Sequence, residues 1–151
     1  MDSTVEIRAV DVADVLPLRH RVLRVGLPPE TAVLDGDSDP GTVALAAFVP
    51  DLPGPVSTAT LMDQPCPWRP GVPARRLRAM ATDAAVQGRG VGSAVLAAAA
   101  GRTAADGGRL VWCNARVAAA GFYARAGFVV DGEVFDTPDF GPHLRMALEL
   151  G

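Results

Sequence analysis

The stretch LRAMATDAAVQGRGVGSAVLAAAAGRTAA, residues 77–105, limits the folds and functions that this 151-residue chain can have. Its mostly apolar residues 77–82 (LRAMAT) predict a short strand, and residues 87–92 (QGRGVG) predict a glycine-rich turn. An alanine-rich helix is expected from about Gly90. Glycines let the backbone approach a ligand closely, and the N–H groups at the start of a helix have no partner within the helix. The stretch therefore predicts a phosphate-binding cradle.

Two common phosphate-binding patterns do not fit this turn. A dinucleotide fingerprint, G-x-G-x-x-G, needs a third glycine, but Ser93 or Val95 occupies that position, depending on where the pattern begins. A nucleotide phosphate loop needs a lysine, and all 14 cationic side chains are arginine. A third pattern, Q/R-x-x-G-x-G/A, matches QGRGVG in full.

A second motif follows the turn, A-x-x-F-Y-x-x-x-G-F over residues 119–128. With the glycine turn and the order of the expected strands and helices, it resembles the GNAT-type N-acetyltransferases, which use acetyl-coenzyme A. The segments LRHRVLR (18–24) and GPHLRM (141–146) resemble a bacterial branch of small acetyltransferases. The resemblance implies a single α/β domain over residues 1–151. Its GNAT-like central sheet would be mixed and mostly antiparallel, with a splayed parallel strand pair and helices on both faces.

The same resemblance assigns roles in cofactor binding. Backbone groups of Met80, Ala81 and Thr82 would pair with the pantetheine arm, and an N–H there would stabilise negative charge on the thioester oxygen. Tyr123, the only tyrosine, would bind near the thioester and protonate the departing thiolate. Ordinary pKa values of about 10 for tyrosine and about 8.5 for a thiol make that transfer feasible. Backbone amides, helped by the arginine side chain, would hold the pyrophosphate: Gln87, Gly88, Arg89, Gly90, Val91, Gly92 and Ser93.

Two assignments stay open at this level. Many members of the superfamily have an asparagine seven residues before the tyrosine, where it contacts the pantetheine; here Arg116 stands at that position and Asn114 lies two residues earlier. A base must also remove a proton from an amine that is mostly protonated near neutral pH. The candidate bases are His143, which a rigid Gly-Pro turn would orient, and two carboxylates, Glu133 and Asp83.

Charge, apolar runs and cysteine content limit the kinds of partner and the cellular locations to be expected. A net charge of −3 gives no reason to expect nucleic acid, and no apolar run approaches the about 20 residues that a membrane-spanning helix needs. The two cysteines form neither a disulfide framework nor a metal site, and Cys113 is predicted to be a buried free thiol. The first ten residues lack the pattern of a signal peptide, so a cytoplasmic location is expected. The resemblance also allows a homodimer.

These observations predict an N-acetyltransferase that transfers acetyl from acetyl-coenzyme A to a primary amine by direct attack in a ternary complex. An acyl-cysteine route through Cys113 has no support, because nothing in the sequence pairs it with a base. The alternative function is a non-catalytic module that binds or senses acyl-coenzyme A. The acidic stretch 26–41 is either a solvated loop or a lid over the acceptor. As a lid, it favours a small cationic amine over a protein acceptor.

The remaining chain predicts a simple order of elements. After a first strand, a helix should follow Asp11 or Asp14, with Pro17 tolerated only near its first turn and Arg19 and Arg21 on a solvated face. The strand at 109–113 is apolar throughout, which predicts a central position parallel to strand 77–82. Further strands are expected at 5–10, 42–49, 56–62, 128–135 and 144–150, a further helix at 117–126, and a loop containing Pro138, Gly141 and Pro142.

Overall fold

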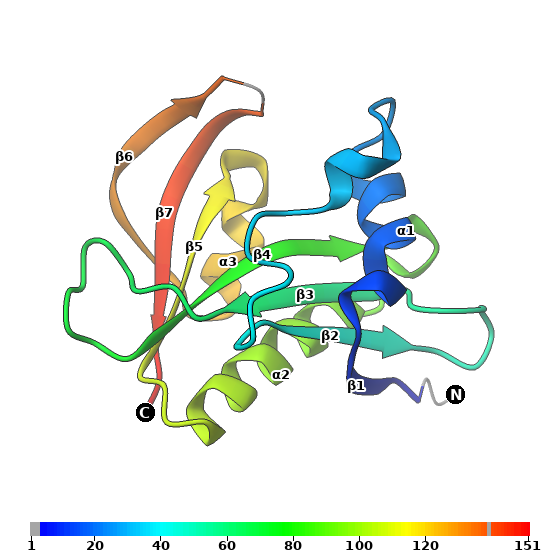
Figure 1. Ribbon diagram of the computed structural model, residues 1–151, viewed down its shortest axis with the longest axis horizontal. Coiled ribbons are helices and arrows are strands. Elements are labelled where there is room, and N and C mark those ends of the chain that lie inside the picture. Colours follow the sequence, from blue (N-terminus) through cyan, green and yellow to red (C-terminus); the bar gives the residue numbers. More distant parts are fainter. Residues whose placement is uncertain (1–3, 139) are drawn as a thin grey trace. The chain divides into compact units, whose positions relative to one another are not determined.

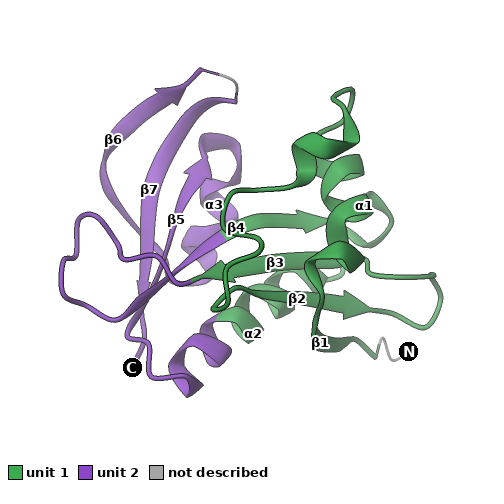
Figure 2. Cartoon of the chain, viewed as in Figure 1, with its two compact units in different colours: residues 1–62, 78–99 green, residues 63–77, 100–151 purple. Residues whose placement is uncertain are grey.

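A computed structural model describes residues 4–138 and 140–151. The chain forms two compact units (Figure 2), of which unit 1 comprises Met1–Met62 and Arg78–Ala99, and unit 2 comprises Asp63–Leu77 and Ala100–Gly151. Two elements, the strand β4 (Ala74–Thr82) and the helix α2 (Val91–Ala105), each contribute residues to both units. That residues 1–151 act as one acetyltransferase domain stays a prediction.

The strands form a mixed sheet in the order β1-β2-β3-β4-β5-β7-β6 (Figure 1). Antiparallel pairing joins β1 to β2, β2 to β3, β5 to β7 and β7 to β6, whereas β4 and β5 are parallel. The parallel ladder covers three positions of each strand, as a splayed pair predicts. The predicted α/β fold class is confirmed. The other strands are β1 (Glu6–Val10), β2 (Val43–Phe48), β3 (Ser57–Met62), β5 (Leu110–Arg116), β6 (Val129–Thr137) and β7 (Gly141–Glu149).

In unit 1, the helix α1 (Val12–Leu23) packs on the sheet through Val15, which contacts Ala44 and Ala46 of β2. Alanines at these strand positions let the helix approach closely. Pro17 lies inside α1, so the prediction that it is tolerated only near the first turn was wrong. The buried side chains Val15 and Leu18 flank it, and their packing holds the helix although proline cannot donate a backbone hydrogen bond.

A buried ion pair attaches the acidic stretch 26–41 to α1, which corrects the prediction of a solvated face for Arg19, whereas Arg21 is exposed as predicted. Arg19 is 1% exposed, and its guanidinium donates to both carboxylate oxygens of Asp37 at 2.8 and 2.9 Å. It also donates to the Ala32 carbonyl at 3.0 Å and to Thr60 Oγ1 of β3 at 2.8 Å. Burial opposes ionisation of Asp37, but the bonds from Arg19 and from the Leu34 amide outweigh it and lower the pKa of that carboxyl.

Unit 2 packs its long loop 63–73 against β5. Trp68 meets Trp112 edge to face with ring centroids 5.4 Å apart, and the indole N–H of Trp112 donates to the Gln64 carbonyl at 2.9 Å. A core cluster of Cys66, Leu110 and Trp112 lies beneath these contacts. Large aromatic area and satisfied indole hydrogen bonding thus hold a loop that has no secondary structure of its own.

Two boundaries in unit 2 differ from the prediction. Residues 117–126 form a 3-10 turn, η3 (Val117–Ala119), followed by the short helix α3 (Ala120–Arg125). Strand β7 begins at Gly141, so Gly141 and Pro142 lie in the strand and not in the loop. Pro142 fits because it pairs only with Asp136 of β6, whereas the pairing with β5 extends no further than His143.

Within the described residues, no helix is long and apolar enough to cross a membrane.

The Arg19–Asp37 ion pair predicts that replacing Arg19 alone destabilises the protein much more than replacing both partners. Arg19→Met should lower the free energy of unfolding by about 3–5 kcal/mol, because it leaves the Asp37 carboxylate buried without its cation. The double variant Arg19→Met/Asp37→Leu should recover most of that loss, because it removes both charges. Urea unfolding measures the difference, with the exposed Arg8→Met as control. Equal losses in the single and double variants would contradict an ion-pair origin.

Candidate acyl-coenzyme A site

The predicted glycine turn is present in unit 1, between β4 and α2. After the 3-10 turn η2 (Ala84–Val86), Gly88 and Gly90 adopt φ angles of +86° and +78°. Space for a side chain is available at both positions, so the backbone conformation is what requires glycine. The turn closes with the Arg89 amide donating to the Val86 carbonyl at 3.1 Å.

The turn leads directly into α2, and the start of that helix has free donors. The first bond of the helix runs from the Ala94 amide to the Gly90 carbonyl at 3.0 Å. The N–H groups of Val91, Gly92 and Ser93 therefore have no acceptor within the helix. Together with the positive end of the helix dipole, they can bind a phosphate group.

The side chain of Gln87 fastens the turn to the end of β4. Its Nε2 donates to the Thr82 carbonyl at 3.2 Å, and Thr82 Oγ1 shares a hydrogen bond of 2.9 Å with Ser57 Oγ of β3. The prediction gave this residue a backbone amide for the pyrophosphate, but that amide donates to the Ala84 carbonyl at 3.3 Å. The side chain instead fixes where the turn begins.

Arg89 has a partner of its own in unit 1. Its guanidinium lies 3.3 Å from Asp51 Oδ2, which lies in the β2–β3 turn, and both side chains are largely exposed. The Arg89 hydrogen bond lowers the pKa of Asp51, so that carboxyl is ionised at neutral pH. An exposed pair of this kind is weak, so a phosphate can displace the carboxylate from Arg89.

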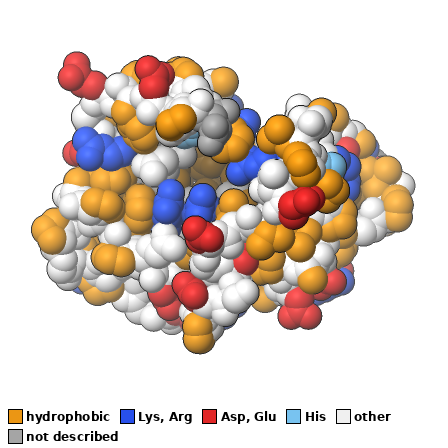
Figure 3. Space-filling model, turned by 45° about the horizontal axis from the view of Figure 1, so that its top comes forward, with side chains coloured by type: hydrophobic (Ala, Val, Ile, Leu, Met, Phe, Trp, Pro, Cys, Tyr) orange, Lys and Arg blue, Asp and Glu red, His pale blue; other side chains and the backbone are white. Residues whose placement is uncertain are grey.

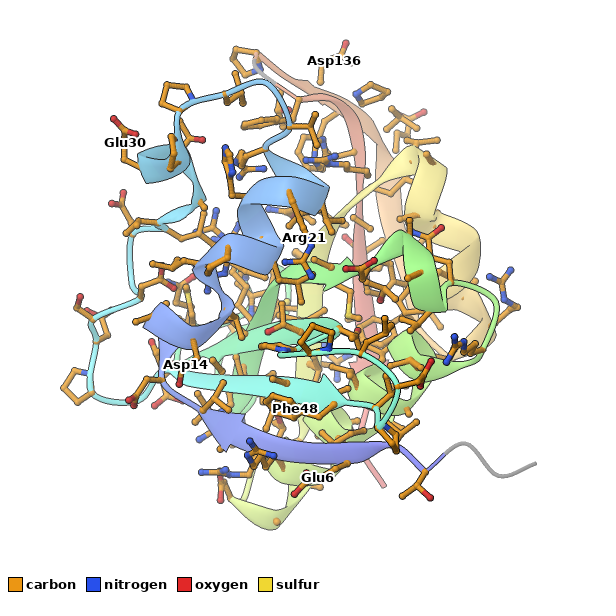
Figure 4. All side chains as sticks on the ribbon, turned by 90° about the vertical axis from the view of Figure 1, so that its right-hand side faces the viewer. Glu6, Asp14, Arg21, Glu30, Phe48 and Asp136 are labelled. Carbon is orange, nitrogen blue, oxygen red and sulfur yellow. The ribbon has the colours of Figure 1, made fainter. Side chains whose placement is uncertain are left out.

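Asp83, a candidate base, is already engaged within unit 1. Its Oδ1 accepts from the Ala85 amide at 2.9 Å. Its Oδ2 accepts at 2.7 Å from Arg21 of α1, which is labelled in Figure 4. The Ala85 bond, followed by the Arg21 bond, lowers the pKa of this carboxyl. A carboxylate stabilised in this way is a poor proton acceptor, and its visible role is to cap η2 and attach α1 to the turn.

One feature of β4 escaped the sequence prediction. Ala79 has a φ of +54° and is the one residue other than glycine with a positive φ in the described parts of the chain. This conformation interrupts the strand immediately before Met80, the first of the three residues expected to face the pantetheine. Backbone strain of this kind is rare for a residue that carries a Cβ, and it redirects the peptide groups that follow.

In unit 2, Tyr123 of α3 is 7% exposed and packs edge-on against the rings of Phe122 and Phe128. Burial raises the pKa of its hydroxyl above the ordinary value; the neighbouring Cys113 adds to the shift and Arg116 opposes it. Tyr123 is therefore protonated at neutral pH, as a proton donor must be. Its hydroxyl makes no hydrogen bond to any of the residues that the structure describes.

His143 is 8% exposed and lies within β7, opposite Arg116 of β5 and Phe135 of β6. The predicted rigid turn is therefore not what orients it. Its Nδ1 lies 2.9 Å from the Gly141 carbonyl, which can only accept, so Nδ1 carries the proton of the neutral ring. Its Nε2 then has a free lone pair, which is the arrangement a general base needs.

The other predicted residues of unit 2 are on its surface. Glu133 is exposed in β6, within the stretch where the register against β7 shifts. Asn114 and Arg116 are both exposed on β5, two residues apart and so on one face of the strand, with the buried Ala115 between them. The Arg116 guanidinium lies 5.6 Å from the centroid of the Phe140 ring. The geometry does not separate Asn114 from Arg116 as the pantetheine contact.

Both cysteines are buried free thiols, as predicted for Cys113. Burial raises the pKa of Cys113 to about 12, so it is a thiol and not a nucleophilic thiolate at neutral pH. Burial also raises the pKa of Cys66. No cluster of three or more His, Cys, Asp or Glu residues suited to a metal ion occurs among the described residues.

Fold and sequence together show the family. The Acetyltransferase (GNAT) domain family matches residues 53–130, and the chain belongs to this family of acyltransferases. It is 33% identical over 141 residues to the uncharacterized N-acetyltransferase YitI of Bacillus subtilis (strain 168), covering 93% of each chain.

Solved structures share the fold. A candidate N-acetyltransferase from Lactobacillus plantarum superposes with a TM-score of 0.79 at 22% identity, over 98% of this chain and 99% of the other. An aminoglycoside 6′-N-acetyltransferase in complex with coenzyme A superposes with a TM-score of 0.76 at 14% identity, over 97% of each chain.

The strained residue in β4 gives a test of the local backbone. Ala79→Gly should keep or raise the midpoint of thermal unfolding, because glycine adopts a positive φ without a Cβ penalty of about 1–2 kcal/mol. Ala79→Val should lower it, because a β-branched residue fits this conformation worst. Thermal unfolding of both variants measures the effect. A valine variant as stable as the wild type would contradict the left-handed conformation.

Proposed function

We propose that this GNAT acyltransferase transfers acetyl from acetyl-coenzyme A to a primary amine by direct attack in a ternary complex. The observation that carries the proposal is the succession of β4, left-handed glycine turn and α2 in unit 1, which leaves the amides of residues 91–93 without acceptors among the described residues. Such a cradle suits the pyrophosphate of coenzyme A, and the absence of lysine disfavours a nucleotide phosphate loop.

The predicted residues divide the binding among them. Of the predicted backbone amides, those of Gly88 and of residues 90–93 would hold the pyrophosphate, because the amides of Gln87 and Arg89 already donate to carbonyls within the turn. The Arg89 side chain would exchange its Asp51 partner for phosphate. Backbone groups of Met80, Ala81 and Thr82 would pair with the pantetheine, and Asn114 or Arg116 would add a side-chain contact. One N–H of residues 80–82 would stabilise the charge that develops on the thioester oxygen. The strain at Ala79 supports this, because it sets the direction of those groups.

The proton transfers follow from the two polar groups of unit 2. The amine nitrogen forms a bond to the acetyl carbon, and the bond from that carbon to sulfur breaks. Tyr123 supplies a proton to the departing sulfur, and the proton lost by the amine passes to a base. His143 suits the base better than Glu133, because its Nε2 lone pair is free and its ring is held. The protonated thiol of Cys113 gives no support to a covalent route.

The acceptor is proposed to be a small cationic amine. Asp37 is neutralised by Arg19, so the acidic character of the stretch 26–41 comes from three exposed carboxylates: Glu30, Asp35 and Asp39. The face drawn in Figure 3 carries acidic and basic side chains interspersed, with neither sign predominating. This mixture does not suit nucleic acid. A cytoplasmic location, supported by two free thiols, and a homodimer remain part of the proposal.

A combination of binding and turnover measurements tests this function. Calorimetry should show binding of acetyl-coenzyme A and much weaker binding of ATP and NAD. Thiol release from acetyl-coenzyme A should increase on addition of some members of a panel of primary amines. A preference for a nucleotide would overturn the cofactor assignment, and tight binding without release on any amine would favour the acyl-coenzyme A sensing module.

The isosteric variant Tyr123→Phe isolates the proposed acid. It should lower kcat about 100-fold or more, because a positioned general acid contributes about 10²–10⁴-fold. The affinity for coenzyme A should change little, and the fold should be as stable, because the hydroxyl makes no hydrogen bond within the described residues. Steady-state thiol release and calorimetry measure the two effects. Unchanged kcat would exclude Tyr123 as the acid.

A further inference from the structure

Arg78 of β4 is a half-buried cation in unit 1 whose side chain makes no hydrogen bond or ion pair to any residue of the described parts. A guanidinium presents five N–H donors in a fixed plane, and the nitrogens of Arg78 are not among the fully buried atoms, so an anion can reach them. The other two arginines of the strand have partners. Arg75 pairs with Asp63 and Asp106, and Arg76 donates to Gln64 and lies over the ring of Trp112.

The charges near Arg78 come from Arg19, Asp37 and Asp35. Asp37 makes no hydrogen bond to Arg78: its Oδ1 accepts from Arg19, and its Oδ2 accepts from both Arg19 and the Leu34 amide. Asp35 is exposed to water, which screens its charge. Asp37 favours the charge of Arg78 more than Arg19 opposes it, but no carboxylate of the described residues makes a hydrogen bond to this guanidinium. Burial lowers the pKa of this guanidinium, which is a further sign that the group has lost water.

Arg78 lies close to the residues proposed to bind the acyl donor and to the stretch suggested as the acceptor lid. It lies two residues before Met80, where the backbone proposed to hold the thioester begins, and two residues of a strand span about 7 Å. Its charged neighbours Asp37 and Asp35 belong to the stretch 26–41, which the sequence suggests as a lid over the acceptor. An anion on Arg78 would thus be held beside both the acyl donor and the acceptor lid.

We propose that Arg78 binds a carboxylate of the acceptor, so that the acceptor is an amino acid or another amine that carries a carboxylate. This rests on the proposed function. Guanidinium and carboxylate match as a two-bond planar pair, which fixes orientation as well as affinity. The exposed carboxylates of the stretch 26–41 attract the ammonium end of the same molecule, so the two ends have complementary partners.

Matched acceptors that differ only in the carboxylate test the proposal. Wild-type protein should acetylate phenylalanine, leucine or alanine with a kcat/KM about 10- to 100-fold above that of phenethylamine, isopentylamine or ethylamine. Arg78→Gln should reduce this ratio to about one, mainly through the KM of the carboxylated member. Arg78→Lys should retain part of the preference, because it keeps the charge without the planar pair. The exposed Arg8→Gln on β1 is the charge-matched control and should keep the wild-type ratio.

A binding measurement makes the test independent of turnover. Calorimetry with the three amino acids, in the presence of free coenzyme A, should show binding to wild type and to Arg8→Gln, weakened at least tenfold in Arg78→Gln. The proposal would be overturned by equal kcat/KM for both members of each pair. It would also be overturned if Arg78→Gln bound the amino acids as tightly as the wild type. If amino acids bind through Arg78 but no amine releases thiol, the proposed function fails while the carboxylate site stands.

Discussion

The unpaired amides at the start of α2 are the constraint around which unit 1 is built. A backbone N–H without an acceptor is tolerated only where water or a ligand can reach it, so the chain must deliver this helix end to an accessible place. Gly88 and Gly90 turn the chain through left-handed conformations. The Asp83 amide donates to the Val56 carbonyl at 2.8 Å and Gln87 donates to Thr82, which hold the turn to β3 and β4. These contacts fix the path of the turn, and none of them uses the amides of residues 91–93 at the start of α2.

A buried ion pair in unit 1 likewise fixes the position of a neighbouring segment. Arg19 donates to both oxygens of Asp37, and the Leu34 amide donates to one of them as well. Such a pair contributes little net stability compared with apolar residues of the same size, because desolvation offsets the attraction. It does specify where the stretch 26–41 lies on α1 and β3, through the contacts of Arg19 with Ala32 and Thr60. The nearby Arg78 interacts with the charge of Asp37 but makes no hydrogen bond to it among the described residues.

Local chemistry explains which parts of the fold were predictable. The glycine turn, the start of α2 and the parallel pairing of β5 follow from residues close together in sequence or from an unbroken apolar run. The burial of Arg19 was missed because its carboxylate partner lies 18 residues away, and helical periodicity places charged residues on a solvated face. The beginning of β7 was missed because Pro142 is excluded only where a strand has neighbours on both sides. Ala79 gave no signal, because alanine is not chosen for a positive φ.

In unit 2, a shared apolar environment around Tyr123 and Cys113 determines what each can do. Desolvation disfavours an anion of either group, so it raises the pKa of both and keeps both protonated. A protonated thiol cannot attack a thioester, but a protonated phenol can give up its proton to a base that forms beside it. A thiolate released into the same environment is itself destabilised, so the pKa of the corresponding thiol rises as well. Proton transfer from Tyr123 to this thiolate is therefore less unfavourable than the tyrosine pKa alone implies. Burial thereby disfavours the cysteine as a nucleophile and keeps the tyrosine protonated, as its proposed role of general acid requires. This selection favours direct attack by the amine over a covalent intermediate.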